Sequence, residues 1–305
     1  MELSEDELLE AIRRVLSGSG PEVRVGPGDD AAVLAPLAGE LVVTTDAMVE
    51  GVHFDTGLTS ARDLGYKAVV VNVSDIAAMA ASPRAAVCAL TLPREVDAAW
   101  TMELFGGMRE ACDEHALWLV GGDLSHGPVI SVTVTVTGEV APGRAVRRDG
   151  AKPGDLLVVT GALGAAAAGL RAARAGDVSH PELLRAHFRP VARVGEAHVL
   201  ARHGATAMID VSDGLGLDLS RLCAASEVGA RMLLADVPVA GGEDYELLAT
   251  LPPEGLEPAR GELRETFGVA LTAIGEVVEG LALVAVDADG DERPLEPEGW
   301  DHFRG

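Results

Sequence analysis

Segments of two lengths alternate along this sequence, and the alternation is what most restricts the fold. Short apolar runs with the length of strands are separated by longer segments with the apolar spacing of helices. In the first half of the chain, the predicted strands are residues 41–45, 84–92, 117–120 and 129–140, and the predicted helices are residues 61–81 and 98–115. Such alternation is typical of strands buried under helices, so we predict an α/β fold.

A turn-rich stretch at residues 141–154 divides the chain into two halves. The second half repeats the alternation, with predicted strands at residues 156–160, 207–211, 231–234, 247–251 and 269–277. A length of 305 residues and a hydrophobic content of 48% are sufficient for two cores. We therefore expect two α/β domains, residues 1–140 and 146–305, joined near residue 145.

The strongly acidic composition excludes several classes of partner. A formal net charge of −24 repels nucleic acids and anionic membrane surfaces. An acidic protein can still bind a polyphosphate when divalent cations lie between its carboxylates and the phosphate oxygens. The residues near the N-terminus lack the basic and apolar pattern of a signal peptide, and the 3 cysteines form no C-x-x-C pair. We expect a cytoplasmic protein that acts on small molecules.

Aspartates recur where predicted strands end. They are Asp29, Asp30, Asp46, Asp123 and Asp210, and Asp213 follows shortly after the last of them. Because strand ends in α/β folds face a common crevice, carboxylates at these positions can converge on one site. Each aspartate could instead begin a turn or cap a helix, but their repetition favours a metal site.

Asp75 has a different setting, because it lies within a predicted helix that is otherwise apolar. A buried carboxylate requires a cation or hydrogen bonds. Asn72, three residues earlier, shares its helix face, and this favours a ligand site. An internal ion pair between Asp75 and Lys67 is the alternative interpretation.

The ligand types indicate which metal is bound. Carboxylate and hydroxyl oxygens without grouped Cys or His suit Mg²⁺, which commonly binds to proteins together with substrate phosphates. The sequence contains neither a P-loop nor a dinucleotide-binding glycine motif. The turn at residues 161–164 precedes an Ala-rich helix whose first amides could face an anion, although close packing of helix on strand would explain the glycines equally well.

A set of motifs in a fixed order identifies the family that this sequence resembles. In chain order they are Gly-Asp29-Asp30-Ala-Ala, Thr44-Thr45-Asp46-Ala-Met-Val-Glu-Gly-Val-His53-Phe, Asn72-Val-Ser-Asp75-Ile-Ala-Ala-Met, Gly-Gly122-Asp123, Arg148-Asp-Gly-Ala-Lys-Pro-Gly-Asp, Ile-Asp210-Val-Ser212-Asp213-Gly-Leu, Gly-Gly-Glu243-Asp-Tyr-Glu-Leu and Gly-Trp300-Asp-His-Phe. The set resembles the thiamine-monophosphate kinases of the aminoimidazole ribonucleotide synthetase-like superfamily. The last two motifs separate these kinases from their relatives.

The resemblance implies a fold and a set of ligands. The N-terminal domain would contain a mixed sheet that forms half of a barrel at a homodimer interface, and the C-terminal domain would be α/β. ATP and several Mg²⁺ ions would bind in the cleft. Between residues 234 and 241 the chain is shorter than is usual in the family, which affects the acceptor side of the site.

The resemblance also implies roles for individual residues. The implied metal ligands are Asp30, Thr44, Thr45, Asp46, Asp75, Asp123, Asp210 and Asp213. The implied ATP contacts are Phe105, Gly122, Asp123, Arg148 and Ser212. The implied acceptor contacts are His53, Glu243 and Trp300. Catalysis would depend on Asp46, Asp75, Asp123, Asp213 and Arg148.

The expected reaction needs little proton chemistry. A phosphate monoester has a second pKa of about 6, so the acceptor is largely a dianion at neutral pH and needs no general base. Mg²⁺ and Arg148 would reduce repulsion between the two phosphate groups. Three alternatives remain: a relative that uses ATP to activate an amide or carbonyl oxygen, a two-metal phosphatase, and a nucleotide sensor without catalysis.

Overall fold

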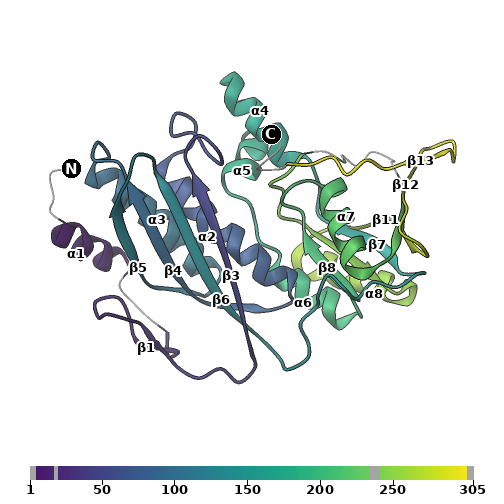
Figure 1. Cartoon of the computed structure of the whole chain (residues 1–305), viewed down its shortest axis with the longest axis horizontal. Coiled ribbons are helices and arrows are strands. Elements are labelled where there is room, and N and C mark those ends of the chain that lie inside the picture. Colours follow the sequence, from purple (N-terminus) through teal and green to yellow (C-terminus); the bar gives the residue numbers. More distant parts are fainter. Residues whose placement is uncertain (1–4, 17–19, 234–238, 240, 301–305) are drawn as a thin grey trace. The chain divides into compact units, whose positions relative to one another are not determined.

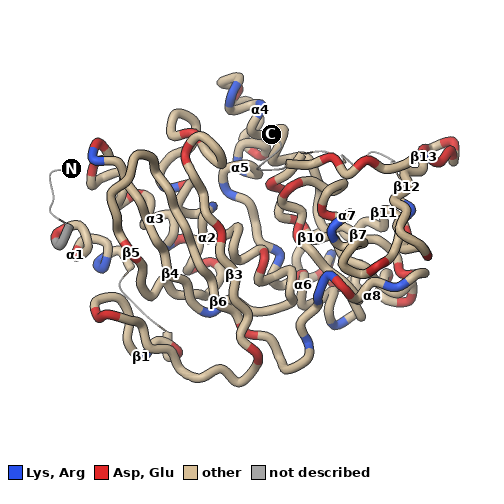
Figure 2. The backbone as a smooth tube through the Cα atoms, viewed as in Figure 1, with Lys and Arg blue, Asp and Glu red and all other residues tan. Residues whose placement is uncertain are grey.

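The computed structural model describes residues 5–16, 20–233, 239 and 241–300. They fall into two compact units. The first unit comprises Met1–Ile76 and Ser82–Gly143, and the second comprises Ala77–Ala81 and Arg144–Gly305. Acidic and basic residues are spread over both units, with the acidic ones more numerous, as the overall charge requires (Figure 2).

The first unit is built on a four-stranded mixed sheet with helices on one face (Figure 1). Its strand order is β3-β6-β4-β5, in which β4 and β5 are parallel and the other pairs antiparallel. The strands are β3 (Glu40–Val49), β4 (Ser82–Leu92), β5 (Trp118–His126) and β6 (Ser131–Val140). The helices are α1 (Glu5–Val15), α2 (Ala61–Ala78) and α3 (Ala98–Glu114), and a short ribbon pairs β1 (Val23–Val25) with β2 (Val33–Leu34).

Alternation along β6 decides which face of this sheet is buried. Val132, Val134 and Val136 are fully buried, whereas Thr133 and Thr135 between them are half-buried. Successive side chains of a strand point to opposite faces, so the valines form the face that packs under the helices. The threonine face is only partly covered by the described residues.

Two glycines allow α2 and α3 to pack closely. A Cβ atom at Gly65 would lie 1.9 Å from the Leu104 carbonyl oxygen, and one at Gly107 would lie 1.8 Å from the Arg62 carbonyl oxygen. Asp97 begins α3 by accepting a hydrogen bond of 2.7 Å from the backbone N–H of Trp100. The helix pair therefore forms a fixed support behind the sheet.

The second unit contains a seven-stranded sheet with the order β13-β12-β9-β11-β7-β10-β8. Its strands are β7 (Leu156–Thr160), β8 (Ala207–Asp210), β9 (Gly229–Leu233), β10 (Leu247–Leu251), β11 (Leu271–Val278), β12 (Leu283–Val286) and β13 (Glu292–Pro294). Its helices are α4 (Ala165–Ala175), α5 (Pro181–Phe188), α6 (Val194–Arg202), α7 (Leu215–Ser226) and α8 (Pro253–Phe267).

The central strand β7 contributes to a hydrophobic core on each face of this sheet. Leu157 and Val159 belong to the core that includes α7, whereas Val158 belongs to the core that includes α6 and α8. A strand covered on both faces reads as a continuous apolar run, and this is why β7 and β10 were predicted with their observed bounds.

The predicted α/β fold is confirmed, and most predicted elements are present. The short strands β1, β2, β12 and β13 were not predicted, since two to four residues give too little pattern. The prediction that Asp46 and Asp123 follow strand ends is wrong, because β3 and β5 each continue for three more residues. Residue 234, the expected end of β9, and most of the shortened segment before Gly241 lie outside the described residues.

Candidate active site

Two of the predicted metal ligands in the first unit are in direct contact. The hydroxyl of Thr44, in β3, donates a hydrogen bond of 2.6 Å to Oδ2 of Asp75, in α2. Strand alternation points Thr44 to the helix-covered face of the sheet, and Asp46, two residues further, shares that face. The bond fixes the orientation of the Asp75 carboxylate next to β3.

Asn72 lies on α2, one turn before Asp75, and is fully buried. Its Nδ2 donates to the Ala68 carbonyl oxygen at 3.0 Å, whereas its Oδ1 has no hydrogen-bond partner among the described residues. A buried acceptor oxygen of this kind is suited to a cation or an ordered water molecule. This part of α2 therefore has the ligand chemistry that Mg²⁺ requires.

The side chains of Thr45 and Asp123 lie on the opposite face of the sheet from Thr44. The hydroxyl of Thr45 is 2.9 Å from the hydroxyl of Thr135, its cross-strand neighbour. Asp123 pairs with Ala89 of β4, and its Oδ2 accepts a hydrogen bond of 2.8 Å from the Ser125 hydroxyl. Neighbouring strand residues alternate between faces, so the side chains of Thr44 and Thr45 point to different sides.

Asp123 lines a pocket of about 640 Å³ within the first unit. The same pocket is lined by Asp30, Phe105 and Gly122, so four of the predicted residues share it. A Cβ atom at Gly122 would lie 1.9 Å from the Cys88 carbonyl oxygen, and only glycine fits this approach of β5 to β4. The pocket combines a mainly apolar lining with the carboxylates of Asp29, Asp30 and Asp123, as small-molecule sites commonly do.

The ring of His53 is oriented by the backbone. Its Nδ1 accepts a hydrogen bond of 3.0 Å from the N–H of Val49, at the end of β3. In a neutral imidazole the proton is then on Nε2. His53 thus stabilises the turn after β3, which does not by itself indicate a substrate contact.

In the second unit, the turn at Ser212 and Asp213 is held by a residue that the sequence did not reveal. Oδ2 of Asp218, a buried residue of α7, accepts hydrogen bonds from the backbone N–H groups of Ser212 and Asp213 at 3.1 and 3.0 Å. Arg221 donates to Asp213 at 2.6 Å and to Asp218 at 2.7 Å. Burial raises the pKa of Asp218, and these donors oppose that shift.

Glu243 and Trp300 both reach this turn. The backbone N–H of Glu243 donates to the Ser212 carbonyl oxygen at 2.7 Å, and that of Trp300 donates to the Asp213 carbonyl oxygen at 3.0 Å. The Glu243 carboxylate lies 3.3 Å from Nδ1 of His187, and Trp300 is 49% exposed. The structure therefore brings Ser212, Asp213, Glu243 and Trp300 together.

The other predicted residues of the second unit have simpler surroundings. Asp210 is the buried last residue of β8, and Arg148 is exposed. The predicted metal ligands are divided between the two units, with Asp210 and Asp213 in the second. Among the described residues, no group of three or more His, Cys, Asp and Glu side chains is arranged to hold a metal ion.

Family models and relatives match almost the whole chain. The model described as AIR synthase related protein, N-terminal domain, matches residues 28–140, and the corresponding C-terminal domain matches residues 152–287. Thiamine-monophosphate kinase of Escherichia coli K12 is 39% identical over 92% of this chain and 93% of its own length, and that of Bacillus subtilis is 34% identical over 92% and 94%. The chain belongs to the thiamine-monophosphate kinase family.

Solved structures agree with membership of this family. Thiamine-monophosphate kinase from Stenotrophomonas maltophilia superposes with a TM-score of 0.83 at 36% identity, covering 95% of this chain and 98% of that one. AaThiL complexed with AMPPCP and TMP gives 0.78 at 31% identity, covering 99% and 98%. The E. coli hydrogenase maturation protein HypE, with a TM-score of 0.81 at 18% identity, shares the fold. In the described part of the chain, no helix has the length and apolarity needed to cross a bilayer.

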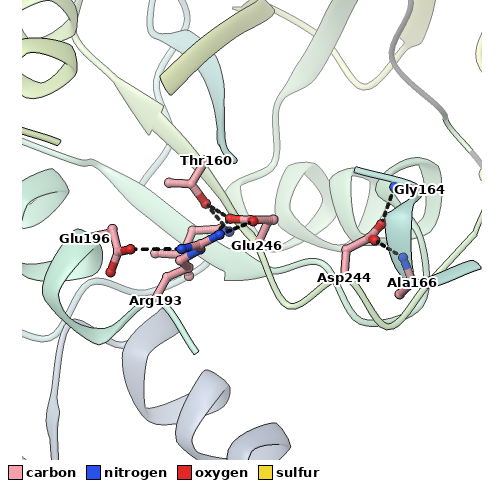
Figure 3. Close-up of polar contacts among 8 residues, drawn as sticks. Thr160, Gly164, Ala166, Arg193, Glu196, Asp244 and Glu246 are labelled. Atoms are coloured by element: carbon pink, nitrogen blue, oxygen red, sulfur yellow. Dashed lines mark hydrogen bonds and ion pairs between the residues drawn. The ribbon is translucent and has the colours of Figure 1, made fainter. Parts of the chain in front are cut away.

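The family motif Gly-Gly-Glu-Asp-Tyr-Glu includes two further acids whose roles were not predicted (Figure 3). Asp244 accepts hydrogen bonds from the N–H groups of Gly164 and Ala166 at 2.7 and 3.1 Å, at the start of α4. The sequence suggested that these N–H groups could face a bound anion. In the structure the carboxylate of Asp244 takes that position. Glu246 accepts from Arg193 at 2.7 and 2.5 Å. The sequence shows both acids but not the distant residues that they contact.

Proposed function

We propose that this chain transfers the γ-phosphoryl group of ATP to thiamine monophosphate, giving thiamine diphosphate and ADP as a step of thiamine biosynthesis. The observation that carries this proposal is the meeting of Glu243 and Trp300 at the Ser212–Asp213 turn. Their two motifs distinguish the thiamine-monophosphate kinases from other members of the superfamily. The names of the relatives and the ligands of AaThiL support the same substrates.

The proposed metal ligands are oxygen donors only, which suits Mg²⁺. They are Asp30, Thr44, Thr45, Asp46, Asp75, Asp123, Asp210 and Asp213, and the buried oxygen of Asn72 adds to the same chemistry. When bound, Mg²⁺ neutralises phosphate charge and stabilises the charge that spreads over the transferring group. The hydrogen bond from Thr44 supports this role, since it orients Asp75 before any ligand binds.

The remaining site residues would bind and orient the two substrates. We assign Phe105, Gly122, Arg148 and Ser212 to ATP, with the Arg148 guanidinium balancing phosphate charge. We assign His53, Glu243 and Trp300 to the acceptor. A thiazolium ring carries positive charge, which the face of an indole and a nearby carboxylate both attract. Because the acceptor phosphate is already a dianion, we assign no residue to proton abstraction.

The test supplies purified protein with ATP, Mg²⁺ and either thiamine monophosphate or thiamine, and follows ADP and thiamine diphosphate by chromatography. Equal amounts of both products from the monophosphate, abolished by EDTA and by Asp46→Asn, are expected. Asp113→Asn is the matched control, because Asp113 is 53% exposed on α3 and outside the proposed site. Absence of thiamine diphosphate in the wild-type reaction would reject the proposal.

The alternative functions give different products in the same experiment. A relative that activates an amide or carbonyl oxygen would release phosphate without forming thiamine diphosphate. A two-metal phosphatase would hydrolyse a monoester without ATP. A nucleotide sensor would bind Mg-ATP tightly without turnover.

We also propose a homodimer that covers the open face of the first sheet. Leu41, Val43 and Val87 are 61%, 56% and 40% exposed, and strand register puts all three on the threonine face. A second copy of this face would remove these side chains from water. Light scattering after size exclusion should give twice the 31.5 kDa chain mass, and Val43→Glu should give the monomer. A monomeric wild-type protein at micromolar concentration would reject this assembly.

The cysteines support the proposed cytoplasmic location. Cys88, Cys112 and Cys223 are unpaired thiols, and burial raises the pKa of each to about 12. Buried thiols without disulfides are typical of proteins in a reducing compartment, where ATP is also available.

A further inference from the structure

The backbone around Glu243 adopts an unfavourable conformation. Glu243 has a φ angle of 66° and Tyr245 one of 53°, both in the left-handed region that residues other than glycine avoid. Such a conformation persists only where surrounding contacts impose it, and it often occurs at functional sites. Contacts on both sides of the Glu243–Glu246 segment impose it here.

One set of contacts anchors the segment through Glu246. Arg193 donates two hydrogen bonds to the Glu246 carboxylate, and the hydroxyl of Thr160 donates a third, of 2.6 Å (Figure 3). Glu196 lies 3.1 Å from the same guanidinium and balances its charge. A paired, largely buried network of this kind has a single favourable geometry.

The other set of contacts leads from Asp244 back to its neighbour Glu243. Asp244 holds the first turn of α4, as described above. α4 packs closely against α5, where a Cβ atom at Gly169 would lie 2.0 Å from the Leu183 carbonyl oxygen and 3.0 Å from Cβ of His187. The position of His187 is therefore tied to the same segment that it contacts.

His187 also contacts the carboxylate of Glu243 directly. Its side chain is 8% exposed, and its Nδ1 lies 3.3 Å from Oε2 of Glu243. Its ring meets the ring of Phe188 edge-on, with centroids 4.8 Å apart, which further restricts its rotation. This contact places Nδ1 within ion-pair distance of one oxygen of the Glu243 carboxylate.

We propose that His187 is a positioning residue, which holds the Glu243 carboxylate in the orientation that receives the cationic ring of the acceptor. This inference rests on the proposed function, because it assigns Glu243 to the acceptor. His187 acts through Glu243 and not on the phosphoryl group. Its loss should therefore weaken acceptor binding while ATP binding and the chemical step change little.

Two amide substitutions test the proposal. His187→Asn places its amide near the position of Nδ1, whereas His187→Gln places it near Nε2, so only the first keeps a polar group facing Glu243. We expect His187→Gln to raise the KM for thiamine monophosphate about tenfold, with KM for ATP and kcat within about twofold of wild type. His187→Asn should recover most of the affinity. His180→Gln, at an exposed histidine just before α5, is the matched control and should behave as wild type.

A double substitution separates positioning from general damage to the fold. If His187 acts through Glu243, then His187→Gln combined with Glu243→Gln should raise the KM no further than Glu243→Gln alone. The proposal would be overturned if the effects of the two substitutions on the KM for thiamine monophosphate multiplied in the double variant. It would also be overturned if His187→Gln raised the KM for ATP as well, or left the KM for thiamine monophosphate normal. An active wild type with a normal His187→Gln rejects only this inference, whereas a wild type that forms no thiamine diphosphate rejects the proposed function and this inference with it.

Discussion

Thr44 and Asp75 form a hydrogen bond of 2.6 Å that joins β3 to α2 at the proposed metal site. Thr44→Val keeps the shape of the side chain but removes the hydroxyl that orients the carboxylate, a bond worth about 1 kcal/mol. We expect the Mg²⁺ concentration for half-maximal kinase activity to rise several-fold, with Thr44→Ser close to wild type. Titration of activity with Mg²⁺ measures this, and identical curves for the two variants would contradict it.

Asp218 should matter more for stability than an exposed acid in an ion pair. Asp218→Ala leaves the N–H groups of Ser212 and Asp213 and the guanidinium of Arg221 without their acceptor. We expect the free energy of unfolding to fall by about 1–3 kcal/mol, measured by urea denaturation. Glu292→Ala removes an exposed partner of Arg231 and should cost less than about 1 kcal/mol. A larger loss in the control would refute the argument from burial.

Two adjacent glycines of α3 should respond in opposite directions to the same substitution. A Cβ at Gly107 would lie 1.8 Å from the Arg62 carbonyl oxygen, whereas one at Gly106 meets only the end of the flexible Arg62 side chain, at 3.3 Å. Gly107→Ala should lower the unfolding free energy by about 2 kcal/mol or more, because backbone must move. Gly106→Ala should leave it unchanged or raise it by up to about 1 kcal/mol through helix propensity. Thermal or urea unfolding of both variants decides the prediction.

Removing only one partner of the ion pair between Arg193 and Glu246 should lower the free energy of unfolding strongly. Their side chains are only 17% and 7% exposed, so Arg193→Met leaves a buried carboxylate with its charge uncompensated. We expect a loss of about 3–5 kcal/mol in unfolding free energy, and a smaller loss when Glu246→Leu is added. The more exposed pair on α3 provides the comparison, because the side chains of Arg109 and Asp113 are 31% and 53% exposed and Arg109→Met should cost less than about 1 kcal/mol. A double variant less stable than Arg193→Met would contradict this account.

His115 should make the stability of the protein depend on pH. Burial lowers the pKa of His115 below its ordinary value of 6.5, with the nearby Glu114 opposing the shift. The unfolded chain therefore binds this proton more tightly, so the contribution is complete above the unfolded pKa and is lost as pH falls toward the folded pKa. Between about pH 7 and pH 5, the unfolding free energy should fall less in His115→Phe than in wild type. Equal slopes in urea denaturation across this range would reject the prediction.

The core elements could be predicted because their residues carry the pattern locally. β7 and β10 are continuous apolar runs buried on both faces, and α2 and α3 have helical length without internal breaks. The family could be inferred because its motifs occur in a fixed order along the sequence, which can be read without knowledge of the fold. Strands of two or three residues, such as β1 and β13, depend on their partners and left no pattern to read.

The sequence by itself determined the fold class, the family and the kinds of ligand atom available, because these depend on residue type and local spacing. Tertiary structure alone decided which residues meet. Alternation within β3 and β5 puts Thr44 and Asp46 on one face of the sheet and Thr45 and Asp123 on the other, although all four lie close to the ends of the strands predicted from the sequence. His187 contacts Glu243 and Arg193 contacts Glu246 across more than fifty residues of sequence, and such contacts depend on packing geometry that no local pattern records.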